Sequence, residues 1–184
     1  MKIITRDQPM DADMSPYHLP DPYPVPVNLL PNAEESALLS VAYAGVNSEM
    51  TALSQYVVHH ETCADTNPDI SHDILQIGII EMFHLDMLGS CIKQLGGSVY
   101  MINRYGKPQY WTSKNIKYGN DLISRLKIDI QSENDCINSY RRIISRLKNP
   151  ALIDLLARII KDEELHITLF NQMIDKLSIP KSVG

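Results

Sequence analysis

The chain has 184 residues, of which 44% are apolar and 21% charged, with a formal net charge of -5. These values are typical of one globular domain, and the negative charge argues against a general attraction to nucleic acid or to anionic membranes. No segment resembles a signal peptide, and none reaches the ~20 apolar residues needed to cross a bilayer. The three cysteines are far apart and odd in number, which argues against a disulfide framework. We therefore expect a cytoplasmic protein without a nucleic-acid or membrane partner.

Residues 1–31 are rich in proline and also contain Tyr17 and Tyr23. Proline lacks a backbone N–H and fixes φ, so this segment can form neither a regular helix nor a central strand. The composition predicts an extended arm. Such an arm either packs along the rest of the chain, packs on a second subunit, or is loosely held.

Residues 32–178 show apolar positions at steps of three and four, which predicts four helices, at about 33–63, 69–96, 118–148 and 150–177. Short connections separate the first two helices and the last two. The aromatic segment 98–117, which has no helical period, joins the two pairs. These connection lengths predict an all-α four-helix bundle with a long crossover between helices 2 and 3, followed by a tail at 179–184.

Six polar side chains fall on the apolar faces of these helices, namely Glu49, Glu81, His84, Glu133, Glu163 and His166. In each Glu-x-x-His motif the two side chains are three residues apart, so they point toward the same region. Burying four carboxylates with no Lys or Arg on the same faces is too costly unless cations neutralise them. Two divalent ions would balance four glutamates. Mixed carboxylate and imidazole donors favour manganese or iron, with zinc possible, so we expect a cofactor of two transition-metal ions.

The two halves of the bundle repeat each other, and a tyrosine follows the lone glutamate of each half by seven residues, at Tyr56 and Tyr140. These tyrosines could donate hydrogen bonds to carboxylates across the bundle, or serve only as core packing. Asp129 and Asp162 could hold the outer nitrogens of the two ligand histidines, or lie on solvated faces. His59, His60 and His72 lie near the first turn and could gather a surface metal, although solvated histidines are the simpler interpretation.

The motifs resemble those of the ferritin-like di-iron and di-manganese carboxylate proteins, which include bacterioferritins, rubrerythrins and manganese catalases. The matching stretches are Tyr43-Ala-Gly-Val-Asn-Ser-Glu49, Glu81-Met-Phe-His84, Glu133 and Asp162-Glu163-Glu-Leu-His166. The resemblance covers about 33–177 and implies a ferritin-like fold. It also implies that Glu81 and Glu163 bridge two metals, while Glu49 and Glu133 each bind one. Met82 stands where bacterioferritins place a haem ligand, but a lone Met is more often a packing residue.

The resemblance implies redox chemistry on peroxide or dioxygen, most like that of a manganese catalase, in an assembly of two or more identical chains. Cys-x-x-Cys pairs are absent, so the built-in electron donor of a full rubrerythrin is missing. Rubrerythrins also carry a further glutamate at the position of Cys136. Ser132 stands where manganese catalases place an arginine, which is a departure from that group. Two alternatives stay open: a ferroxidase or iron-binding protein, and a structural or coat protein that metals stabilise without turnover.

Overall fold

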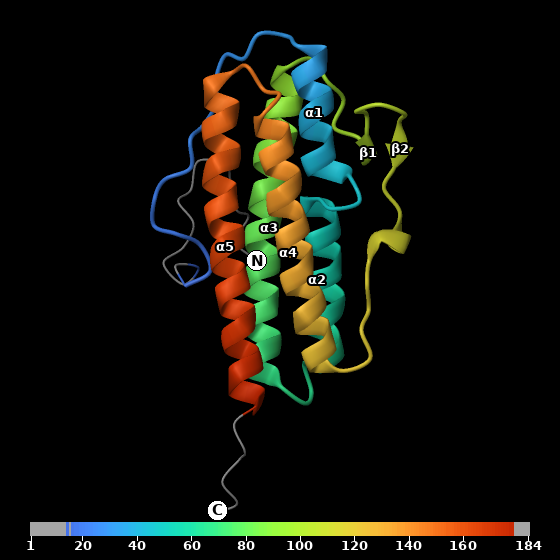
Figure 1. The fold of residues 1–184 in the computed structure, drawn as a ribbon, viewed down its shortest axis with the longest axis vertical. Helices are drawn as coiled ribbons and strands as arrows, with labels where there is room; N and C mark the ends of the chain where they lie inside the picture. Colours follow the sequence, from blue (N-terminus) through green and yellow to red (C-terminus); the bar gives the residue numbers. More distant parts are fainter. Residues whose placement is uncertain (1–13, 15, 179–184) are drawn as a thin grey trace, which may run out of the picture.

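The structure, a computed structural model, describes Met14 and residues 16–178 and is an all-α bundle (Figure 1). Its helices are α1 Ala33–Ala44, α2 Glu49–Cys63, α3 Pro68–Gln94, α4 Leu122–Ile144 and α5 Pro150–Ser178. Helices α1 and α2 follow one another in the first position of a four-helix bundle, which confirms the predicted fold class. The expectations for residues 1–13 and for the tail at 179–184 lie outside the described residues.

The predicted first helix, 33–63, is divided in two at residues 45–48. A Cβ atom at Gly45 would lie 2.5 Å from the carbonyl oxygen of Val41, so the backbone makes a close approach here that only glycine permits. Ser48 then caps α2, its hydroxyl accepting from the backbone N–H of Thr51 at 3.4 Å. The apolar face continues across the break, and for this reason the periodicity predicted one helix. As a result, Glu49 becomes the first residue of α2.

Helix α2 packs on α3 and helix α4 on α5, as two antiparallel pairs (Figure 1). Helix α3 ends just before Gly96, whose φ of +80° suits a helix stop and agrees with the predicted end. The following crossover runs the length of the bundle, as the long aromatic connection predicted. It contains a small antiparallel hairpin, β1 Ile102–Asn103 with β2 Gln109–Tyr110, and the short 3₁₀ helix η2 Ser113–Asn115.

Two apolar clusters fill the bundle. One includes Leu88 and Leu156, and the other includes Ile74 and Phe170. On α3, α4 and α5, the polar residues that the sequence singled out fall between the buried members of one cluster and those of the other. Glu49 lies in the chain between Ala44 of the first cluster and Ala52 of the second. The core therefore has a polar layer between two apolar ones.

Among the described helices, α3 is the one whose length and composition would allow it to cross a membrane. Half of its most apolar 18-residue window is buried inside the bundle, and it carries the buried side chains Glu81 and His84. This is the pattern of a core helix.

The described part of the arm, residues 16–31, lies against the bundle of its own chain (Figure 1). The Gln94 side chain of α3 donates to the carbonyl of Pro26 at 3.0 Å. Arg158 of α5 donates to the carbonyl of Asp21 at 2.9 Å. These two hydrogen bonds attach the described arm to α3 and to α5.

Candidate metal centre

The six residues proposed as metal ligands converge in the polar layer, and each is at most 1% exposed. They form two overlapping groups in which one donor atom per residue lies within 4.8 Å of the others. The first group is Glu49, Glu81, His84 and Glu163; the second is Glu81, Glu133, Glu163 and His166.

Glu81 and Glu163 belong to both groups because each turns one oxygen toward each histidine. His84 Nδ1 lies 3.3 Å from Glu81 Oε2 and 3.5 Å from Glu163 Oε1. His166 Nδ1 lies 2.9 Å from Glu81 Oε1 and 3.2 Å from Glu163 Oε2. The two imidazole rings, 6.3 Å apart between centroids, therefore flank a shared pair of carboxylates.

Glu49 and Glu133 belong to one group each, and each accepts a hydrogen bond from a tyrosine of the facing helix. Tyr140 donates to Glu49 Oε1 at 2.6 Å, and Tyr56 donates to Glu133 Oε1 at 2.5 Å. Burial, followed by repulsion from the neighbouring carboxylates, raises the pKa of both phenols, so they stay protonated donors. These are the cross-bundle contacts that the sequence spacing predicted.

One oxygen of each glutamate accepts no hydrogen bond, namely Glu49 Oε2, Glu81 Oε1, Glu133 Oε2 and Glu163 Oε1. Within residues 16–178, no Lys or Arg pairs with these four carboxylates. Buried carboxylate oxygens without a donor are costly, and a cation is the partner that would satisfy them. The donor set therefore fits a pair of metal ions.

The pKa values of the residues in the polar layer reflect the repulsion between their charges. Without a bound cation, burial and then repulsion from neighbouring glutamates raise the pKa of Glu49 and Glu133 well above the ordinary value of 4.5. Burial opposes the protonation of His84 and His166, but the groups around them raise both pKa values well above 6.5. Metal ions would have to displace these protons.

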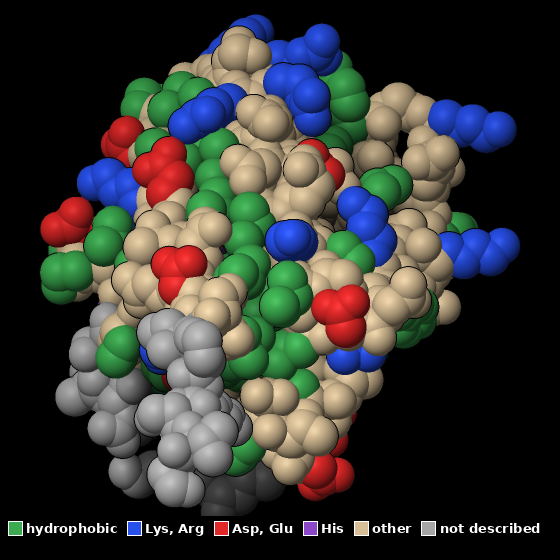
Figure 2. Space-filling model, turned by 60° about the horizontal axis from the view of Figure 1, so that its bottom comes forward, with side chains coloured by type: hydrophobic (Ala, Val, Ile, Leu, Met, Phe, Trp, Pro, Cys, Tyr) green, Lys and Arg blue, Asp and Glu red, His purple; other side chains and the backbone are tan. Residues whose placement is uncertain are grey.

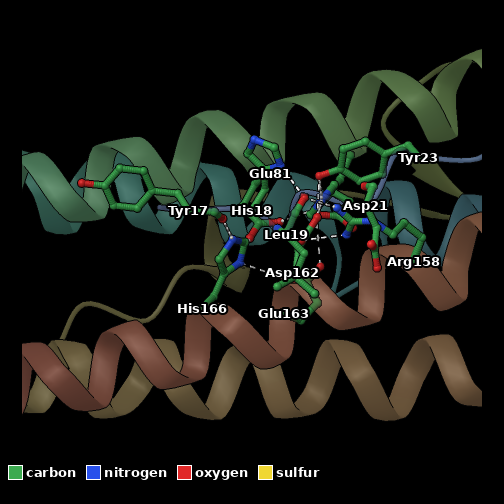
Figure 3. Close-up of polar contacts among 12 residues, drawn as sticks. Tyr17, His18, Leu19, Asp21, Tyr23, Glu81, Arg158, Asp162, Glu163 and His166 are labelled. Carbon is green, nitrogen blue, oxygen red and sulfur yellow. Dashed lines mark hydrogen bonds and ion pairs between the residues drawn. The ribbon is translucent and has the colours of Figure 1, made fainter. Parts of the chain in front are cut away.

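The outer nitrogens of both histidines also have partners, and Figure 3 shows His166 beside Tyr17. His84 Nε2 lies 3.3 Å from Asp162 Oδ2, the contact expected for that aspartate. His166 Nε2 lies 2.9 Å from the backbone carbonyl of Tyr17, in the arm. Tyr23, also in the arm, contacts both His84 and Asp162. Sequence reasoning missed the roles of both tyrosines, because an extended segment has no periodicity from which to infer a direction.

The expected contact between Asp129 and a ligand histidine differs in the structure. Asp129 Oδ2 lies 2.9 Å from Nδ1 of His59, and its Oδ1 accepts from Gln55 at 2.8 Å. Asp129 lies on the side of α4 that faces α2, whereas the outer nitrogen of His166 faces the arm. The aspartate therefore supports the α2–α4 contact and the crossover, because His59 Nε2 is 2.9 Å from the carbonyl of Lys117.

The histidines near the first turn do not gather into a site. His59 is buried against Asp129, while His60 bonds to Ser71 on α3 and His72 is exposed. Met82 is 42% exposed and faces away from the bundle interior.

Two neighbouring cavities lie where the chain breaks between α1 and α2. A surface pocket of about 400 Å³ is lined by residues of the break and of the crossover, including Val46, Tyr110 and Asn115. A second cavity of about 10 Å³, close to the smallest that can hold one water, shares Val46 and Asn115 and reaches Cys136. Burial, and then repulsion from the four glutamates, raise the pKa of the Cys136 thiol, which lines this cavity.

The fold and the buried carboxylate–imidazole layer define a helical bundle protein of the dinuclear-metal class. Residues 44–179 match the ferritin-like domain, and the chain belongs to this family. Comparison with curated protein sequences finds no match.

Solved structures with the same fold include a manganese catalase from Anabaena, with a TM-score of 0.76 and 18% identity over 100% of this chain and 85% of the catalase. A bacterioferritin from Mycobacterium tuberculosis has a TM-score of 0.68 and 21% identity, over 81% of this chain and 89% of its own. A bacterioferritin from Rhodobacter capsulatus has a TM-score of 0.68 and 23% identity, over 80% of this chain and 88% of the bacterioferritin.

Proposed function

We propose that the protein is a dinuclear manganese or iron oxidoreductase that disproportionates hydrogen peroxide, as a manganese catalase does. The observation that carries this proposal is the pair of overlapping donor groups, which share Glu81 and Glu163 and contain one histidine each. Two redox-active ions bound there would supply a two-electron change. In the overall reaction one peroxide is oxidised to dioxygen and a second is reduced to two waters, so no outside electron donor is needed.

In this proposal the residues of the chain have separate tasks. Glu81 and Glu163, which belong to both donor groups, would hold both ions, while Glu49 and Glu133 would each hold one. Tyr140 and the equivalent Tyr56 fix the orientation of these single-ion carboxylates through their hydrogen bonds. The surrounding apolar clusters exclude bulk water, which strengthens every electrostatic contact in the layer.

One observation favours a catalase over a ferroxidase: one manganese catalase structure matches 100% of this chain and another matches 88%, whereas the bacterioferritins match about four fifths of it. The lack of Cys-x-x-Cys pairs disfavours a rubrerythrin with a built-in electron donor. One residue differs from the manganese catalases: Ser132 stands where they carry an arginine. Its hydroxyl accepts a hydrogen bond from Gln55 at 3.1 Å.

The cavities at the α1–α2 break suit a small substrate. The outer cavity measures about 400 Å³, and the inner one, which reaches Cys136, has about the size of one water. Hydrogen peroxide is only slightly larger than water, and in this proposal it enters from this side.

The experiment is to load the purified protein with Mn²⁺ or with Fe²⁺ and to follow dissolved oxygen. Oxygen evolution on adding peroxide to the manganese form supports the catalase. Oxygen uptake on adding Fe²⁺ would instead support a ferroxidase, the alternative that the bacterioferritin fold suggests. If both forms are inert while metal removal melts the protein, the metals have a structural role, as in a coat protein.

We also propose a cytoplasmic homo-oligomer of two or more chains. The arm exposes Val25, Val27 and Leu30 by 76%, 66% and 81% of their surface, and Figure 2 shows a strip of apolar side chains between charges of both signs on one face. Exposed apolar surface of this kind is typical of interfaces. Sedimentation equilibrium measures the assembly size, and a monomer at all concentrations would refute it.

A further inference from the structure

The arm closes over the outer face of the candidate metal centre (Figure 3). The carbonyl of Tyr17 lies 2.9 Å from His166 Nε2, and the backbone N–H of Leu19 donates to Asp162 Oδ1 at 2.8 Å. The hydroxyl of Tyr23 donates to Asp162 Oδ2 and lies 3.2 Å from His84 Nε2. Residues 17–23 thus contact the outer nitrogens of both proposed histidine ligands.

Arg158 fastens this segment to α5. Its guanidinium donates to the carbonyls of Leu19 at 2.7 Å and Asp21 at 2.9 Å, and pairs with Asp162 Oδ1 at 2.7 Å. The same group lies 4.3 Å from the centroid of the Tyr23 ring, a cation–π distance. Arg158 is only 4% exposed, and such a buried cation is tolerated because it is paired and hydrogen-bonded.

These contacts select one tautomer of each imidazole. The Tyr17 carbonyl can only accept a hydrogen bond, so in the neutral ring His166 Nε2 carries the hydrogen and the lone pair is on Nδ1. The Asp162 carboxylate also can only accept, so His84 Nε2 carries the hydrogen of that ring as well. In both rings Nδ1 is the atom that faces the glutamates, so the arm leaves each histidine ready to bind a metal ion.

We propose that residues 17–23 are an integral part of the metal centre, with Tyr23 as a positioning residue, so that arm docking and binding of a divalent transition metal stabilise each other. This inference rests on the proposed metal centre. The coupling must be reciprocal: whatever loosens residues 17–23 lowers metal affinity, and metal binding tightens this segment.

The first test is Tyr23→Phe, which keeps the ring over Arg158 and removes the hydroxyl. We expect Mn²⁺ affinity, measured by calorimetry, to fall roughly tenfold or more, as it does when other groups that orient metal ligands are removed. The spectrum of the protein loaded with Co²⁺ should shift as well, because the His84 ring changes its orientation. Tyr118→Phe, at an exposed tyrosine, is the matched control and should change neither.

The second test is hydrogen–deuterium exchange of the peptide that spans residues 17–25. We expect Mn²⁺ to slow exchange of this peptide in the wild-type protein and to slow it less in Tyr23→Phe. Gln94→Ala removes the more distant attachment of the arm at Pro26 and Leu29, and should leave Mn²⁺ affinity unchanged.

The outcomes separate the two proposals. If the wild-type protein binds no Mn²⁺, the metal centre and the arm inference both fail. If it binds Mn²⁺, while Tyr23→Phe binds equally well and Mn²⁺ leaves exchange of residues 17–25 unaltered, the arm inference is overturned and the metal centre stands. The unfolding transition of metal-free Tyr23→Phe shows whether the variant is folded.

Discussion

At the scale of single residues, the shared carboxylates give the sharpest prediction. Glu81→Gln removes one charge from both donor groups, so we expect metal content to fall at both positions. Glu49→Gln removes a donor from one group and should leave about one ion per chain, since the second group is complete without it. Elemental analysis and calorimetry measure this difference.

A matched control for these variants is Glu164→Gln, next to Glu163 on α5 but on the surface, where it pairs with Arg141. It should bind both ions. Equal loading of Glu81→Gln and the wild-type protein would remove the basis for the bridging assignment.

The tyrosines give a second prediction. Tyr140→Phe and Tyr56→Phe each leave a buried carboxylate oxygen without its donor, which costs roughly 1–3 kcal/mol in unfolding free energy. We also expect metal affinity to fall about 10- to 100-fold. Because the two halves are equivalent, the two variants should behave alike in denaturant unfolding and in Mn²⁺ titration. If both match the wild-type protein, the tyrosines serve only as core packing.

The residues whose convergence the sequence predicted lie on helices. A helical period fixes the direction of a side chain, so Glu-x-x-His spacing and the seven-residue step to Tyr56 were sufficient to place these groups. The backbone contacts of Tyr17 and the partner of Asp129 depend on which segment packs alongside. That information is tertiary and does not appear in the local pattern.

At the scale of elements, the break between α1 and α2 is the feature that periodicity missed. Gly45 and Ser48 are ordinary stop and start signals, but the apolar face runs through them and favoured a single helix. Residues 44–46 at the break line the surface pocket, and Glu49 follows them in the chain as the first residue of α2.

A substitution at the break tests this route. Val46 is 60% exposed and lines both cavities, so Val46→Trp should narrow the path. We expect kcat/KM for peroxide to fall several-fold at unchanged metal content, and to fall further for a bulkier organic hydroperoxide. Val57→Trp, on the exposed side of α2, is the control. Full activity of Val46→Trp would show that substrate enters elsewhere.

At the scale of the whole molecule, the bundle and its crossover were predictable because connection lengths and helix faces agree with one another. The charge of the polar layer leads to a further prediction. In the metal-free protein the pKa values of Glu49, Glu133, His84 and His166 are all raised, so these groups hold protons to higher pH than they would in water. Binding two ions near pH 6 should therefore release the two protons of the histidines, and further protons from the glutamates.

Calorimetry in buffers of different ionisation enthalpy measures this release. Binding without proton release would mean that the ions bind outside the polar layer.

The same groups should make the stability of the metal-free protein depend on pH. A group whose pKa is raised by folding stabilises the folded state below its unfolded pKa, and this contribution is lost as the pH rises through the folded pKa. For Glu49 and Glu133 the loss begins near 4.5, and for His84 and His166 near 6.5. Asp162, whose pKa is lowered from 3.8, has the opposite effect, but only in more acidic solution.

We therefore expect the unfolding free energy of the metal-free protein to fall steadily from about pH 5 to pH 8, as urea titrations would measure. Saturating Mn²⁺ should abolish or reverse this slope, because metal binding replaces the protons that the folded site would otherwise have to retain. The double variant Glu49→Gln with Glu133→Gln removes two of the raised carboxyl groups and should flatten the metal-free slope between pH 4.5 and 6.5. A metal-free protein with equal stability at pH 5 and pH 8 would mean that the four carboxylates do not repel one another as their burial implies.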